Sequence, residues 1–141
     1  MSRLKILGGE WIMYEKLNSL EQIAVDILNR EIEEELKKRN LEKNILASFR
    51  YFEKIGIYVS IREDRDIAKE FKNEILVLNE LNFSYKISEG FLYRDLILNY
   101  KQVILFAKEK GLIQILEKLI VDMKNNILFV EDLKWLLVRT K

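Results

Sequence analysis

The chain has 141 residues, of which 49% are apolar and 33% are charged, and its 24 basic and 23 acidic side chains leave a formal net charge of +1. This near balance excludes a generally basic surface that coats nucleic acid, and the composition excludes a disordered chain. The chain contains neither cysteine nor histidine, which excludes disulfides, zinc clusters and thiol or imidazole catalysis.

We expect one domain over residues 1–141, with residues 112–141 as an alternative helical C-terminal extension. The apolar runs are too short to cross a bilayer, so no membrane partner is expected. The N-terminus lacks the apolar segment of a signal peptide, which predicts a cytoplasmic protein.

The N-terminal part of the chain predicts a short strand followed by a long helix. Residues 3–7 alternate and end at a pair of glycines, which is typical of a strand that enters a tight turn. Ser19 and Gln22 have the spacing of a capping box, and apolar residues behind them repeat at helical spacing as far as Asn40.

The next stretch, from Leu41 to Ile55, leaves two alternatives open. Its apolar residues are spaced by three and four, which favours a second helix that Gly56 would cap in the left-handed conformation. The rival interpretation is a strand through residues 47–53, where aromatic residues are dense.

A buried strand over Ile57 to Ile61 is the central predicted element, and it ends in two carboxylates, Glu63 and Asp64. Asp64 or Asp66 then caps a third predicted helix. The apolar face of that helix is formed by Ile67, Phe71, Ile75 and Leu78.

The remaining pattern predicts two strands and three helices. Alternation from Phe83 to Ser88 predicts a strand, and Ser88 would cap a fourth helix that runs through Ala107 and ends at Gly111. A fifth helix is expected over residues 112–123, a brief strand over 127–129 and a last helix over 132–139.

Strands separated by helices imply parallel pairing with right-handed crossovers. We therefore predict an α/β fold, rich in helix, in which a small and mostly parallel sheet of about three or four short strands is flanked by about five or six helices.

Two segments resemble a known family. Residues 107–113 read Ala-Lys-Glu-Lys-Gly-Leu-Ile and precede helical spacing and then residues 129–133, which read Phe-Val-Glu-Asp-Leu. Residues 61–71 carry an acidic strand end that runs into a helix. Together these are similar to the PIN-like nucleic-acid-binding proteins related to VapC-type toxins, over about the last two-thirds of the chain.

The resemblance implies a protein that acts on RNA, either as a weak Mg-dependent endoribonuclease or as an inactivated derivative, with an antitoxin-like protein partner. Glu63 and Asp64, with Asp66 as an alternative, match the family's late acidic pair. Glu63 and Asp64 would hold Mg²⁺ or Mn²⁺, while Glu10 and Glu42 would complete the catalytic set. This chain departs from the family because Gly8-Gly9-Glu10 stands where an aspartate is expected, and no glycine precedes Glu42.

Another role for the acidic pair is structural, since Glu63 and Asp64 at a strand–helix junction can simply cap the helix and interact with its dipole. Whether the chain is an enzyme is therefore left open.

Basic residues recur beside aromatic ones along the chain, which predicts a second function, non-catalytic binding of single-stranded nucleic acid. The residues expected to carry it are Arg50, Tyr51, Lys86, Arg94 and Lys101. The alternative is that each aromatic side chain faces the core and each cation faces water. A third function is a helical interaction or assembly module without a nucleic-acid role, which would form a homo-oligomer through its apolar C-terminal helices.

Overall fold

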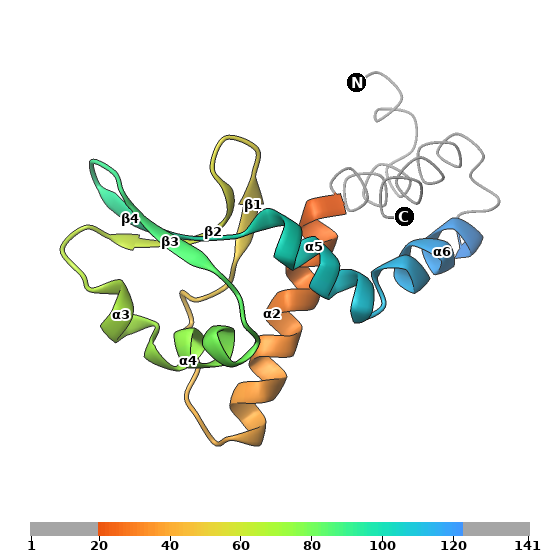
Figure 1. The fold of residues 1–141 in the computed structure, drawn as a ribbon, viewed down its shortest axis with the longest axis horizontal. Coiled ribbons are helices and arrows are strands. Elements are labelled where there is room, and N and C mark those ends of the chain that lie inside the picture. Colours follow the sequence, from red (N-terminus) through yellow and green to blue (C-terminus); the bar gives the residue numbers. More distant parts are fainter. Residues whose placement is uncertain (1–19, 123–141) are drawn as a thin grey trace.

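The computed structural model describes residues 20–122, and these form one layer of strands against one layer of helices (Figure 1). The elements in chain order are α2 (Leu20–Lys38), β1 (Arg50–Phe52), β2 (Gly56–Arg62), α3 (Ile67–Glu70), α4 (Lys72–Glu80), β3 (Tyr85–Glu89), β4 (Tyr93–Leu98), α5 (Tyr100–Glu109) and α6 (Leu112–Asp122).

The sheet is antiparallel throughout, with the strand order β1-β2-β4-β3. The predicted, mostly parallel sheet is therefore wrong. The physical reason for two of the three pairings is that β1 and β2, and likewise β3 and β4, are joined by short hairpins, which can only join antiparallel strands. The third pair, β2 and β4, is antiparallel as well. The sequence analysis preferred a helix where β1 lies, with a strand only as the rival, and it missed β4. The remaining strands therefore looked as if helices always separated them.

The helix favoured over Leu41 to Ile55 is wrong, and the rival strand interpretation is the closer one. The chain turns at residues 45–46 and then forms β1, whose hairpin closes with a hydrogen bond from Ile55 N to Phe52 O of 3.0 Å. Gly56 has a φ of +106°, as the expected helix cap would have, but it starts β2 after a hairpin loop. A left-handed glycine is required by both structures, so the residue alone cannot distinguish them.

The predicted fourth helix is wrong in its first half. The chain from Ser88 to Leu98 completes β3, turns at Gly90 and returns as β4. The helix α5 begins only at Tyr100, where the Asn99 side chain accepts a hydrogen bond from Gln102 N at 3.1 Å. Leu96 and Leu98 are buried while Ile97 between them is not, which is the period of a strand.

Several other predictions are confirmed. The long first helix is α2, the central strand is β2, and α6 follows Gly111, whose φ of +105° ends α5. Asp66 caps the third predicted helix through a hydrogen bond from Ala68 N of 3.0 Å, although that helix is interrupted at Phe71 and forms α3 and α4. The elements predicted for residues 3–7, 127–129 and 132–139 lie outside the described residues.

All described helices that pack on the sheet lie on one of its faces, with α2, α3 and α4 below the strands in Figure 1. The core between the layers contains buried side chains of α2, β2 and β4, among them Leu28, Ile57, Val59, Leu96 and Leu98. Within residues 20–122, no helix combines the length and apolar character needed to cross a membrane.

Candidate functional site

The face of the sheet that lies away from α2, α3 and α4 has no described helix over it, and we call it the open face. Residues directly opposite each other in antiparallel strands project to the same face. Tyr58 alternates with the buried Ile57 and Val59, so it projects to the open face. Arg50 pairs with Tyr58, Tyr58 with Ile97, and Ile97 with Lys86.

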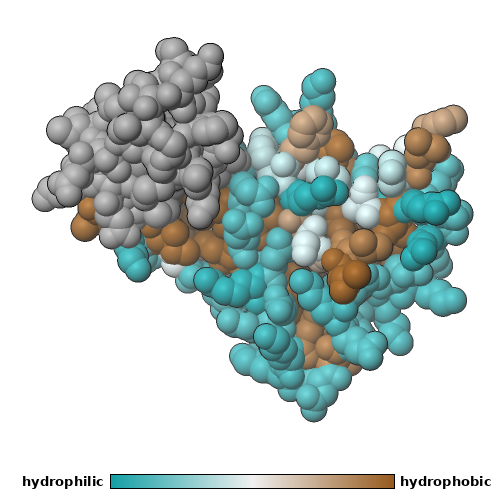
Figure 2. Space-filling view, turned by 180° about the vertical axis from the view of Figure 1, so that it is seen from behind, coloured by the Kyte–Doolittle hydropathy of each residue, from teal (hydrophilic) through white to brown (hydrophobic). Residues whose placement is uncertain are grey.

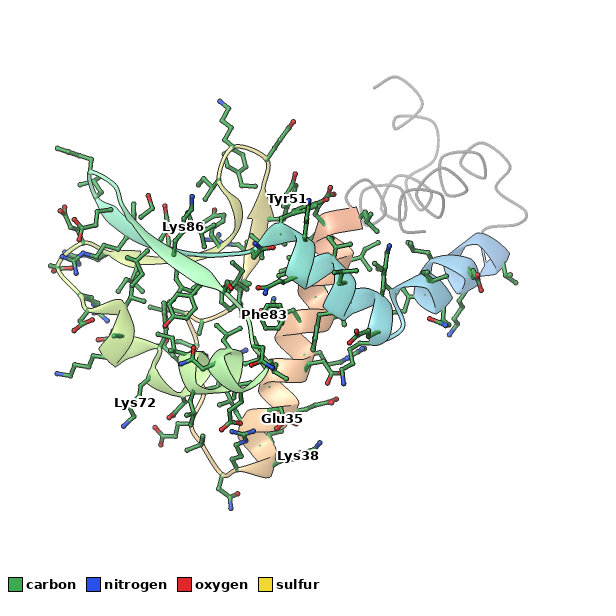
Figure 3. All side chains as sticks on the ribbon, in the orientation of Figure 1. Glu35, Lys38, Tyr51, Lys72, Phe83 and Lys86 are labelled. Carbon is green, nitrogen blue, oxygen red and sulfur yellow. The ribbon has the colours of Figure 1, made fainter. Side chains whose placement is uncertain are left out.

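These four residues, Arg50, Tyr58, Ile97 and Lys86, form a row across all strands of the sheet, which we call the cross-strand row. A cation stands at each end, and an aromatic and an aliphatic side chain lie between them. The guanidinium carbon of Arg50 lies 5.7 Å from the centroid of the Tyr58 ring, within the range of a cation–π contact. Lys86 is exposed and projects upward from the sheet in Figure 3, away from Phe83, which points into the core.

Most other positions of the open face are polar, with the half-exposed Phe52 as an exception, and the face carries a small excess of positive charge. Ser60 pairs with Asp95, and Asp95 pairs with Ser88. Arg62 pairs with Tyr93 at the end of β2. The strand positions of this face thus hold three cations, Arg50, Arg62 and Lys86, against one carboxylate, that of Asp95.

A shallow depression of about 450 Å³ borders the open face at the end of β4, where α5 begins. Gly56 contributes no side chain here, and Ile97 and Lys86 of the cross-strand row line the same depression. Tyr85 and Tyr100, which are 37% and 40% exposed, also line it. The depression therefore brings apolar and aromatic residues close to a lysine.

A second depression of about 520 Å³ lies at the other end of β4. It is lined by Arg62, Glu63, Asp64, Leu92, Tyr93 and Arg94. Apolar surface protrudes beside it at the end of the β3–β4 hairpin (Figure 2), where Phe91 is 90% exposed. The Nε of Arg94 is enclosed and has no hydrogen-bond partner among the described residues, and it lies 3.7 Å from Glu89 Oε1.

The acidic residues expected to form a metal site lie in separate places. Glu63 and Asp64 are exposed on the turn after β2, where Asp64 Oδ2 lies 3.4 Å from Arg62 Nη2. Glu42 is exposed on the loop after α2 and lines a different depression, beside α3 and α4. Glu10 lies outside the described residues. In the part of the chain that the structure describes, no group of three or more acidic residues is placed to hold a metal ion.

The residues expected to bind nucleic acid are divided by the fold. Arg50 and Lys86 belong to the cross-strand row, and Arg94 lines the second depression. Tyr51 pairs with the buried Ile57, so it projects to the helix side, where its ring centroid lies 6.4 Å from that of Tyr100. Lys101 is exposed on α5.

Sequence reasoning missed Tyr58, Ile97, Arg62 and Tyr93 as residues of the open face. The signal that could have found Tyr58 and Arg62 was present, because burial of alternate residues in the predicted strand sends the residues between them to the other face. Ile97 and Tyr93 could not be found this way, since they lie on the strand that was mistaken for a helix.

No protein-family model, curated protein or solved structure is significantly similar to this chain.

Proposed function

We propose that the protein binds single-stranded nucleic acid on the open face of its sheet. The observation that carries this proposal is the cross-strand row, in which Tyr58 and Ile97 form an apolar strip between Arg50 and Lys86. Bases stack on flat aromatic and apolar surfaces, while phosphates pair with lysine and arginine.

Charge supports a modest affinity with a measurable dependence on salt. Contact of Arg50, Arg62 and Lys86 with one phosphate each would release bound counterions, and for a single strand each contact contributes about 0.7 to the slope of log K against log salt. We expect a slope of about −2 for the wild-type protein. Because the net charge of the chain is only +1, binding would take place at this face and not over the whole protein surface.

A single strand fits this site better than a duplex. The cross-strand row lies on a sheet face, and the unstacked bases that would lie on Tyr58 are available only in single strands, loops or ends. RNA is the ligand that the resemblance to PIN-like proteins implies, and the sheet face itself can stack ribonucleotides and deoxyribonucleotides alike.

The test is fluorescence anisotropy of labelled oligonucleotides with the wild-type protein and single variants. Tyr58→Ala removes the stacking surface and is expected to weaken binding roughly 5- to 150-fold, since stacking contributes about 1–3 kcal/mol per base. Tyr58→Phe keeps the ring and should bind nearly as the wild type does. Lys86→Ala should reduce the salt slope by about 0.7.

The matched control is Lys72→Ala, because Lys72 is exposed on α4, in the helix layer on the other side of the sheet (Figure 3). It removes the same charge as Lys86→Ala and should leave the affinity unchanged. Equal losses in the two lysine variants, or no binding to single strands at low salt, would contradict the proposal. Circular dichroism of Tyr58→Ala separates lost binding from lost folding.

Metal-dependent cleavage of the bound strand is the second candidate. It is favoured by one feature, namely that Glu63 and Asp64 line the same depression as Arg62 and Arg94. Incubation of the labelled RNA with protein and Mg²⁺ or Mn²⁺ tests it. Cleavage that Asp64→Asn abolishes would establish the activity, whereas RNA that stays bound and intact would leave binding as the function.

A further inference from the structure

The strand β3 forms one edge of the sheet, and all five of its residues are exposed. Its hairpin partner β4 forms backbone hydrogen bonds to alternate residues of the β3 segment. Asn99 N donates to Ser84 O at 3.1 Å, and Gly90 N donates to Tyr93 O at 2.8 Å. In an antiparallel pair of strands, every second residue forms backbone hydrogen bonds to the neighbouring strand. Lys86 and Ser88, which lie between Ser84 and Gly90 at this spacing, therefore also bond to β4.

It follows that Tyr85, Ile87 and Glu89 direct their backbone N–H and C=O groups away from the sheet. Such an edge is a template for a further strand. Two of the three side chains are apolar and partly uncovered, with Tyr85 at 37% and Ile87 at 49% exposure. Both project to the helix side, because they pair with the buried Leu98 and Leu96.

The opposite edge of the sheet is less available to another chain. The strand β1 has only three residues. Just before it, the Asn29 side chain on α2 binds both backbone groups of Phe49, with distances of 2.8 Å to the nitrogen and 2.9 Å to the oxygen. Therefore β3 is the longer free edge within residues 20–122.

We propose that β3 pairs antiparallel with β3 of a second copy of this chain, about a two-fold axis at Ile87. Only the register centred on Ile87 pairs all three outward residues, matching Ile87 with itself and Tyr85 with Glu89 of the second copy. No like charges face each other in this register, since Lys86 lies opposite Ser88 of the second copy and isoleucine lies against isoleucine.

The neighbouring registers are less favourable. A two-fold axis at Lys86 would place two lysines directly opposite each other, which is destabilising, and would leave the backbone of Glu89 unpaired. An axis at Ser88 would leave the backbone of Tyr85 unpaired. Since the net charge of the chain is only +1, long-range repulsion between two copies is weak.

Pairing at this edge would join two four-stranded sheets into one continuous sheet with a common open face. The two cross-strand rows would then lie on one surface, each with its Lys86 nearest the axis. The proposed dimer does not depend on the proposed function, although it would lengthen the surface available to a single strand.

The absence of cysteine from the chain allows a direct test of the register, because one introduced cysteine is the only thiol present. In the full chain, Ile87→Cys should form a disulfide-linked dimer under mild oxidation, since residues opposite each other have Cα atoms about 5.5 Å apart. Tyr85→Cys alone should not cross-link, because it lies four residues out of register, about 14 Å from its counterpart. Glu89→Cys alone should not cross-link either. A mixture of the Tyr85→Cys and Glu89→Cys proteins should cross-link, because these two positions lie opposite each other in the proposed dimer.

A second measurement does not depend on oxidation. Sedimentation velocity of the wild type should show a dimer of the 16.9 kDa chain, and Ile87→Pro should shift the mass toward the monomer. Proline removes the outward N–H at this edge and leaves the hydrogen bonds to β4 in place. Ser84→Ala, just before the strand, is the control expected to remain dimeric.

Several outcomes would overturn the proposal. A wild-type mass that stays monomeric at all concentrations means that no second copy occupies this edge. Self-cross-linking of Tyr85→Cys as efficient as that of Ile87→Cys excludes the register. A dimer that Ile87→Pro leaves intact and Ile87→Cys fails to cross-link has its interface elsewhere.

Discussion

Among single residues, Gly56 has the backbone conformation expected from the sequence, but it lies in a different element from the expected one. Gly56 takes the left-handed conformation with φ +106°, as glycine readily does. A Cβ added there would meet only Ile97 Cγ2, at 3.9 Å, so the requirement for glycine is conformational and not a matter of space. The requirement is the same in a helix cap and in a hairpin, and only the neighbouring strand distinguishes the two.

The ion pair between Arg39 and Glu80 links the end of α2 to the end of α4. Its hydrogen bond lowers the pKa of Glu80 from the ordinary value of 4.5 and raises the pKa of Arg39. Because the folded-state pKa of Glu80 is depressed, its contribution to stability is present above the ordinary pKa and is lost as the pH falls through the lowered one.

We therefore predict that Glu80→Gln flattens the pH dependence of stability in the acid range. Urea unfolding between about pH 5 and about pH 3 should show a smaller loss of stability for Glu80→Gln than for the wild type. The change is small because both groups are exposed to solvent. Glu34→Gln, which removes an exposed carboxylate from α2, is the control, and identical profiles for wild type and Glu80→Gln would contradict the prediction.

At the scale of elements, the placement of β1 depends on a side chain of α2. The Asn29 carboxamide both donates to Phe49 O and accepts from Phe49 N, so it replaces the strand that β1 would otherwise have as a neighbour. Phe49 is buried beside Arg50, the first residue of the cross-strand row. One asparagine therefore links the helix layer to the proposed binding face.

We predict that Asn29→Ala lowers the free energy of unfolding by about 1–3 kcal/mol, because two backbone groups of Phe49 lose their partners. Urea denaturation measures this loss, and hydrogen exchange at Arg50 should become faster. Asn79→Ala, at an exposed position on α4, should change stability by less than about 0.5 kcal/mol. Unchanged exchange at Arg50 would mean that β1 is held without Asn29.

At the scale of the whole molecule, a single core joins the helix layer to the sheet. Leu28 of α2 is fully buried, as are Ile57 of β2 and Val103 of α5. The helix α2 contacts β1, α4, α5 and α6, so a change in its buried face affects every layer that surrounds it. Loss of packing on α2 should therefore destabilise all the described residues together, in a single cooperative unfolding transition.

We predict that Leu28→Ala lowers the free energy of unfolding by about 2–5 kcal/mol, through lost burial and the cavity that remains. Leu105→Ala is the matched control, because Leu105 of α5 is 59% exposed. It should change stability by less than about 0.5 kcal/mol. Thermal unfolding followed by circular dichroism measures both, and equal effects would contradict a shared core at Leu28.

Elements whose signals are local could be predicted from the sequence alone. The long amphipathic pattern of α2, the alternation of β2, the Asp66 cap and the glycine after α5 each arise from contacts within a few residues, so their periodicity or capping chemistry could be read directly. The same reasoning picked out Arg50 and Lys86, which the fold places in one row.

Contacts between distant segments set the strands β1 and β4, the antiparallel order of the sheet and the separation of Glu42 from Glu63 and Asp64. These features depend on partners distant in the sequence. The apolar residues of 93–98 are compatible with helix or strand until β2 and β3 supply hydrogen bonds on both sides. Pairing between distant segments also sets which side chains share a face, and for that reason the cross-strand row could not be assembled from spacing alone.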